Sequence, residues 1–268
     1  CKETGEELED GIQAWDWRYY AEIVRIKKYN FNESELKPYL SLDKITEAVF
    51  AVSERLYGLK YIYRPDIISY HKDVKVYEVH ENNKLKAIFL HDNYARSMKA
   101  SGAWMNELRS QTKNTNSINP LDKIPIVMNN NNFAKGSPTL LSFDDAITLF
   151  HEMGHGHHGM LSDCTYNRLA STNVLTDFLE LPSQLMEHWI KNPIVLKEYA
   201  LHYENNSIVP DDVLKRRKDA SSFNQGFDTI EYTSCALLDI AMHSLTTNEY
   251  ETFDMMEFER TQLLKLGM

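Results

Sequence analysis

The sequence predicts an α+β fold that is mostly α-helical and contains a small β-sheet. Apolar residues recur at helical spacing in residues 15–58 and again from Ser142 onward. Between these stretches, short segments rich in valine and isoleucine alternate with polar residues, as β-strands do. We therefore expect helices in residues 1–58, a small sheet with loops in residues 59–133, and a helical core in residues 142–268.

The first zone contains two predicted helices. The segments are WDWRYYAEIVRIKKYN, residues 15–30, and LDKITEAVFAVSERLYG, residues 42–58. In both, apolar side chains return every three or four positions, so that they share one face of a helix. Gly58 is expected to end the second helix.

In the second zone, residues 59–133, the sequence predicts a β-hairpin and one further strand. YHKDVKVYEVHE (residues 70–81) and KLKAIFLHDNYA (residues 84–95) are separated by polar turn residues. IPIVMNN (residues 124–130) is the further strand. NELRSQTKNTNSINPLDK (residues 106–123) is polar and rich in asparagine, and we expect a surface loop there.

Composition excludes several classes of partner. The chain has 268 residues, a formal net charge of −10 and no basic stripe, so nucleic acid is not an expected partner. No apolar run is long enough for a membrane span, and no targeting segment is visible, so no membrane partner is expected. Three cysteines without framework spacing favour a reducing compartment, and we expect a cytoplasmic location.

The segment LFHEMGHGHHGML, residues 149–161, contains four histidines and one glutamate. On a helix, His151 and His155 lie one turn apart on the same face and can bind one metal ion. Glu152 lies about 100° round the helix, where it can take a proton from a water molecule beside the metal. His158 shares the face, but three ligands on successive turns span about 10 Å, which one ion cannot bridge. His157 points elsewhere.

The third ligand is therefore expected from another segment. TNVLTDFLELPSQLMEHW, residues 172–189, supplies Glu180, a carboxylate that we expect to be buried among apolar neighbours and to need a cation as partner. Asp177 and Glu187 are alternatives, although Asp177 is more typical of a helix cap and Glu187 of a surface or supporting position. Gly154 and Gly156 would allow this second helix to approach the first closely. Ser142 and Asp145 have the spacing of a helix-start box.

Longer segments resemble a known family. LSFDDAITLFHEMGHGHHGML, STNVLTDFLELPSQLMEHW and ASSFNQGFDTIEYTSCALLDIAMH are similar to the M3 family of thimet-oligopeptidase-like zinc metallopeptidases, especially to its bacterial peptidyl-dipeptidases. Weaker similarities follow in WDWRYYAE, RLYGLKY, YHKDVKVYEV and SGAWMNELR, so the resemblance covers nearly the whole chain.

The resemblance implies a zincin-like catalytic core built around the HExxH helix, with residues 1–268 as part of one catalytic region. It implies that His151, His155 and Glu180 bind one zinc ion and that Glu152 is the general base. The 25-residue separation of His155 and Glu180 matches the family pattern.

The activity implied is zinc-dependent hydrolysis of peptide bonds in short oligopeptides, with release of C-terminal dipeptides. Internal cleavage of oligopeptides and a non-catalytic zinc-binding fragment are the alternatives; an unrelated hydrolase with a chance motif is remote. We expect residues Val127, Met128, Asn129 and Asn130 to form an edge strand that binds the substrate backbone.

The chain departs from the family pattern in two ways. Met153 replaces a phenylalanine, which is a tolerable apolar exchange. The glycine- and tyrosine-rich segment that follows in family members is absent from these residues, as is the long helical region that precedes Cys1. We therefore expect an internal piece of a larger enzyme, which by itself hydrolyses peptides poorly or not at all. Exposed apolar surface would then favour self-association.

Overall fold

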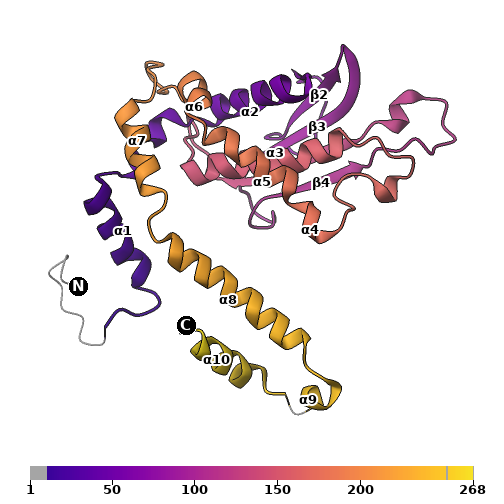
Figure 1. Cartoon of the computed structure of the whole chain (residues 1–268). Coiled ribbons are helices and arrows are strands. Elements are labelled where there is room, and N and C mark those ends of the chain that lie inside the picture. The colour runs from indigo at the N-terminus through magenta and orange to yellow at the C-terminus, as the bar shows by residue number, and fades with distance from the viewer. Residues whose placement is uncertain (1–10, 252, 268) are drawn as a thin grey trace. The chain divides into compact units, whose positions relative to one another are not determined.

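The computed structural model describes residues 11–251 and 253–267, which form two units. One unit is Asn32–Leu214, and the other joins the residues up to Phe31 with those from Lys215 onward. Helices predominate and one small sheet is present, so the predicted α+β class is confirmed (Figure 1). No helix among the described residues is both long and apolar enough to span a bilayer.

The sheet lies in the Asn32–Leu214 unit and has the strand order β1-β2-β3-β5-β4. The strands are β1 (Leu59–Tyr63), β2 (Lys75–Glu81), β3 (Lys84–Tyr94), β4 (Trp104–Arg109) and β5 (Ile126–Phe133). Only the β3–β5 pair is parallel. The predicted hairpin is confirmed as β2 and β3, and its turn residues Asn82 and Asn83 have φ angles of 51° and 61°. Asparagine tolerates this left-handed conformation better than most residues.

Two strands differ from the expectation. Residues 106–109, predicted as part of a loop, belong to β4, which pairs with β5 as Trp104↔Asn130 and Met105↔Asn129. β4 contains polar side chains and one of its sides faces solvent, so the alternation of apolar and polar residues typical of a strand was weak in the sequence. β1 was not identified as a separate strand; it pairs with β2 along the opposite edge of the sheet.

One face of the sheet is covered by α2 (Leu42–Tyr57) and α3 (Phe143–Met160). The ring of Phe50 in α2 stacks on Tyr61 at 4.0 Å, and Gly159 in α3 lies against Val127. Ser41 caps α2, and Gly58 ends it with a φ of 70°, as predicted. The opposite face carries a separate apolar cluster of Val74, Val76 and Leu90, with Ile88, Ile126 and Met128 packed against it.

The remaining elements of this unit are short. They are the 3-10 helices η1 (Glu33–Glu35), η2 (Lys37–Tyr39), η3 (Pro120–Lys123) and η4 (Asn167–Leu169), and the α-helices α4 (Thr176–Leu179), α5 (Leu181–Ile190) and α6 (Pro193–Tyr199). α5 packs along α3, and α6 packs against α2 and α5. Helix α7 (Asp211–Ala220) crosses the division between the units.

The other unit contains α1 (Trp17–Tyr29), α8 (Gln225–His243), α9 (Thr247–Glu251) and α10 (Met255–Lys265). The predicted helix in residues 15–30 is confirmed as α1. Within this unit the ring of Trp17 lies 4.2 Å from that of Phe227, and Arg18 forms an ion pair with Glu231 at 3.6 Å. These contacts link α1 to α8.

Candidate functional site

Helix α3 carries the histidine motif and begins at a capping box. Asp145 donates its backbone N–H to the Ser142 hydroxyl at 3.0 Å, and Ser142 donates its own N–H to the Asp145 carboxylate at 2.9 Å. Two otherwise unpaired donors of the first turn are satisfied in this way. The helix-start signal in the sequence is confirmed, and it sets the register of the histidines two turns later.

Helix α5 approaches α3 at Gly154. A Cβ atom at Gly154 would lie 2.4 Å from the Pro182 carbonyl oxygen and 2.4 Å from Ser183 Cα, so no other residue fits without movement. Gly156 does not serve this contact, contrary to the expectation. It faces the side chain of Asn129 on β5 instead, because it lies on the side of α3 that faces the sheet.

Glu180 lies at the junction between α4 and α5. Ser183 donates its hydroxyl to the Glu180 carboxylate Oε2 at 2.7 Å and to the Glu180 carbonyl at 2.8 Å. Pro182, in the first turn of α5, is well suited to a helix start because it lacks an N–H. The helix start and the Ser183 bond together turn the carboxylate toward α3.

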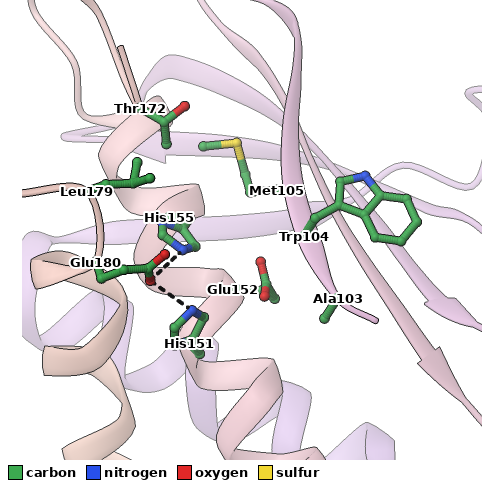
Figure 2. Close-up of a pocket in the computed structure, with 9 residues that line it drawn as sticks. All are labelled: Ala103, Trp104, Met105, His151, Glu152, His155, Thr172, Leu179 and Glu180. Carbon is green, nitrogen blue, oxygen red and sulfur yellow. Dashed lines mark ion pairs between the residues drawn. The ribbon is translucent and has the colours of Figure 1, made fainter. Parts of the chain in front are cut away.

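His151, His155 and Glu180 converge on one point (Figure 2). Glu180 Oε2 lies 3.2 Å from Nε2 of His151 and 3.2 Å from Nε2 of His155, and all three candidate ligand atoms lie within 4.8 Å of one another. Two ligands of a tetrahedral zinc ion, each about 2.1 Å from the metal, are separated by roughly 3.4 Å. Two imidazoles and one carboxylate are also a common donor set for zinc. The residues therefore fit such an ion.

The protonation of His155 and Glu180 suits metal binding. Burial lowers the pKa of His155, which favours its neutral, metal-binding form. Partial burial raises the pKa of Glu180, but the Ser183 hydrogen bond and the two histidines lower it more, so its pKa is below the ordinary value. The expectation of a buried Glu180 is wrong, because its side chain is 47% exposed. The carboxylate lies on the open side of the pocket, where its neighbours Phe178 and Leu181 are also exposed.

Glu152 is buried, with 4% of its surface exposed, and it lines the same pocket. Its carboxylate atom Oε2 has no hydrogen-bond partner among the described residues. Burial, opposed by His151 and assisted by Glu180, raises the pKa of Glu152 to about 7. In Figure 2 the carboxylate lies between the convergent group and the segment of Ala103, Trp104 and Met105, where β4 begins. A carboxylate with this pKa can both accept and donate a proton near neutral pH.

Glu187 orients His151 from behind. Its Oε1 lies 2.9 Å from His151 Nδ1, and its Oε2 accepts a hydrogen bond from Lys191 at 3.1 Å. A carboxylate in this position fixes the ring and leaves Nε2 free for a metal. Glu187 therefore contacts Nδ1 of His151 and is not one of the three residues that converge.

The remaining candidates from the sequence, Asp177, His157 and His158, do not belong to the group of His151, His155 and Glu180. Asp177 is exposed. His158 packs its ring 6.0 Å from that of Phe178. His157 is buried with its Nε2 2.7 Å from the Ser53 hydroxyl, which itself donates to a backbone carbonyl of α2. His157 therefore links α3 to α2.

A pocket of about 290 Å³ surrounds the group. Besides the motif residues, it is lined by Ala103, Trp104 and Met105 of the β4 region and by Thr172 and Leu179. The sequence interpretation missed these five residues. The alternation in WMNELR was the available signal, but its polar members made a loop the simpler interpretation.

The expected edge strand is wrong. β5, which contains Val127, Met128, Asn129 and Asn130, pairs with β3 on one side and with β4 on the other, so it lies inside the sheet. Val127 and Asn129 direct their side chains toward α3. The strand at this edge is β4. The sequence could not reveal this order. β4 comes before β5 along the chain, but in the sheet β5 lies between β3 and β4.

The chain matches peptidase family M3 over residues 1–265. It is 41% identical over 262 residues to the dipeptidyl carboxypeptidase of Escherichia coli (strain K12), which covers 96% of this chain and 37% of that protein. It is 33% identical over 237 residues to the oligopeptidase A of the same organism, covering 88% and 35%. The probable cytosolic oligopeptidase A of Arabidopsis thaliana is 31% identical over 251 residues, covering 91% and 36%. The chain thus spans little more than a third of the length of these curated relatives.

Proposed function

The chain belongs to peptidase family M3, and on that premise we propose that it is the metal-binding part of a zinc-dependent peptidase acting on short peptides. The observation that carries the proposal is the convergence of His151, His155 and Glu180 beside the buried carboxylate of Glu152. A zinc ion held by these ligands would supply Lewis-acid chemistry for the activation of a water molecule and the polarisation of the scissile carbonyl.

Glu152 acts as the general base and then as the general acid. It accepts a proton from the attacking water and donates it to the leaving amine. A pKa of about 7 suits both steps, since a group near this value can gain and lose a proton readily at neutral pH. Glu187 keeps His151 in the orientation that directs Nε2 into the site.

Strand β4 binds the substrate backbone. Its outer side has no strand partner among the described residues, and its residues Trp104 and Met105, with the preceding Ala103, line the pocket. An extended peptide can add to such an edge through main-chain hydrogen bonds. This assignment replaces residues 127–130, whose backbone groups face two neighbouring strands.

Release of C-terminal dipeptides is the proposed mode of cleavage. The support is that the dipeptidyl carboxypeptidase of Escherichia coli (41% identical) is more similar to this chain than is its oligopeptidase A (33% identical). Internal cleavage of oligopeptides, as an oligopeptidase would perform it, is the second candidate.

The test begins with the metal content of the purified chain, for which we expect one zinc ion per chain. Glu180→Ala should remove most of the zinc, whereas Glu152→Gln should retain it. In a form of the protein with the length of the curated relatives, hydrolysis of an N-blocked tetrapeptide, followed by mass spectrometry, should release a dipeptide, and Glu152→Gln should abolish this release; the chain by itself should hydrolyse the peptide poorly or not at all. Zinc that stays bound after Glu180→Ala contradicts the ligand set. A zinc-loaded chain that binds no peptide and cleaves none supports the non-catalytic alternative.

A further inference from the structure

Residues 95–103 connect β3 to the edge strand β4, and we name this connection the β3–β4 loop. Its last residue, Ala103, and the first two residues of β4 line the pocket beside His151 and Glu152. The loop contains no regular helix or strand. Its position must therefore come from side-chain contacts.

Lys99 in this loop is buried unusually deeply for a lysine, with 3% of its side chain exposed. Its ammonium group donates to the carboxylate of Asp92 at 3.1 Å and to the carbonyl oxygens of Asp92 and Tyr94, both at 3.0 Å. It also donates to the carbonyl oxygen of Asn131 on β5. The ammonium group of Lys99 thus binds backbone carbonyl oxygens of both β3 and β5, which are parallel neighbours.

These acceptors lie where the sheet ladders are interrupted. β2 pairs with β3 only as far as His91, and the register between β3 and β5 shifts between Asp92 and Tyr94. A buried carbonyl group that loses its ladder partner is costly. Lys99 replaces the missing partners and, in doing so, fixes the loop to the irregular end of the sheet.

The charge of Lys99 is balanced at the same point. Asp92 is fully buried and accepts two hydrogen bonds from Arg96, at 2.6 and 2.7 Å, and one from Tyr70 at 2.7 Å. Burial raises the pKa of Asp92, but the hydrogen bonds from Arg96, Tyr70 and Lys99 together lower it to about 2. Asp92 is therefore ionised at neutral pH, and it binds two side chains of the loop, those of Arg96 and Lys99.

Asn132 holds the end of the loop next to β4. Its side-chain amide donates to the carbonyl oxygens of Ala100 and Gly102, both at 2.7 Å. Gly102 has a φ of 81°, a conformation that favours glycine, and it directly precedes Ala103. The neighbouring Asn130 donates to the carbonyl oxygen of Trp104 at 3.3 Å. The asparagine run of β5 thus contacts the backbone on both sides of Ala103.

We propose that Lys99 and Asn132 are positioning residues of the peptidase site: they hold the β3–β4 loop so that β4 begins at a fixed place opposite the metal-binding group. The inference rests on the proposed function, because it takes β4 to bind the peptide. It adds that two residues outside the pocket keep β4 in the position that peptide binding needs. The hydrogen bonds of Lys99 and Asn132 go to residues other than His151, Glu152, His155 and Glu180, and neither residue lines the pocket. Their variants should therefore change peptide binding without changing metal binding.

The variants are Lys99→Met and Asn132→Asp. The first keeps the length of the side chain and removes the charge. The second keeps the shape and replaces two donated hydrogen bonds by repulsion from two carbonyl oxygens. Lys113→Met is the control for the first, since Lys113 forms an exposed ion pair with Asp163. Asn205→Asp is the control for the second, because the side-chain oxygen of Asn205 accepts a hydrogen bond from Ser207, and an aspartate oxygen can accept the same bond.

Three measurements are made on zinc-loaded chains that also carry Glu152→Gln, which prevents turnover. Zinc content should stay at one per chain in all variants. Hydrogen exchange of residues 100–105 should accelerate about tenfold or more in Lys99→Met and Asn132→Asp, while α3 and both controls stay unchanged. The dissociation constant of N-acetyl-tetra-alanine, measured by calorimetry, should rise roughly ten- to a hundredfold.

The outcomes separate the two proposals. Unchanged exchange in residues 100–105 in both variants overturns the positioning role, as does faster exchange with an unchanged dissociation constant. If Lys99→Met fails to fold, Asn132→Asp decides the matter, since Asn132 is only partly buried. Zinc-loaded Glu152→Gln that binds no peptide contradicts the proposed function, and the exchange rates then still decide whether Lys99 and Asn132 fix the strand.

Discussion

Gly154 in α3 lies directly against Ser183 in α5: a Cβ atom on Gly154 would come within 2.4 Å of Ser183 Cα and 2.7 Å of its nitrogen. The contact is between backbones, which cannot move aside as a flexible side chain can. Because Ser183 also orients the Glu180 carboxylate, this one contact links helix packing to the geometry of the group formed by His151, His155 and Glu180.

Gly154→Ala should therefore weaken both folding and zinc binding. Overpacking of this kind costs about 1–3 kcal/mol of unfolding free energy, and displacement of α5 moves Glu180 away from the histidines. Urea unfolding and a zinc titration measure the two effects. Gly226→Ala in α8 is the matched control, because a Cβ atom there meets nothing within 4 Å. Equal stability and zinc affinity in both variants would contradict the close-contact argument.

Glu187→Gln should weaken zinc binding while leaving the fold intact. The substitution keeps the size of the side chain but removes the charge that holds the His151 ring. Loss of such a supporting carboxylate typically costs about 10- to 100-fold in metal affinity. Competition with a chromophoric chelator measures the affinity. Glu198→Gln, which alters an exposed ion pair with Arg55, should have no effect; a similar loss in that control would point to a general charge effect.

Ser142→Ala should lower stability through the start of α3. The hydroxyl accepts the Asp145 backbone N–H, and loss of such a cap typically costs about 1 kcal/mol. Urea unfolding gives the change in free energy. Ser34→Ala is the comparison, since the Ser34 contact with Asn32 uses its backbone N–H and survives the substitution. No difference between the two variants would mean that the capping box does not contribute to stability.

Stability should fall on mild acidification because His91 is buried in a neutral form. Burial, together with the charge of Lys75, lowers the pKa of His91 to about 3. Below its ordinary pKa of about 6.5 the unfolded chain binds a proton that the native chain does not, so each such histidine removes about 1.4 kcal/mol per pH unit. The contribution of His91 is therefore complete above pH 6.5 and is lost progressively as the pH falls toward 3.

Urea unfolding between neutral pH and about pH 5, with a chelator present to exclude metal effects, measures this slope. His91→Phe should reduce it by about 1.4 kcal/mol per pH unit, since the replacement ring packs beside Phe50 and Phe89 and does not titrate. An unchanged slope in the variant would show that His91 is protonated in the native state.

The sequence by itself determined the features that depend on local periodicity. A helix places residues four apart on one face whatever surrounds it, so the relation of His151 to His155 was predictable. The capping box at Ser142, the helix end at Gly58 and the hairpin of β2 and β3 are local in the same sense. The resemblance to the M3 family then singled out Glu180 by its distance from His155 along the chain.

Only the tertiary structure decided how distant segments meet. It brings Glu180 beside both histidines and places Glu187 behind His151, because α5 packs on α3 through Gly154. It also leaves Glu180 half exposed. Strand order is decided in the same way: residues 127–130 have the apolar pattern of a strand wherever they lie, and only long-range pairing puts β4 outside them at the edge. Backbone pairing between strands leaves little trace in side-chain types, which is why the sequence predicted the strand but not its neighbours.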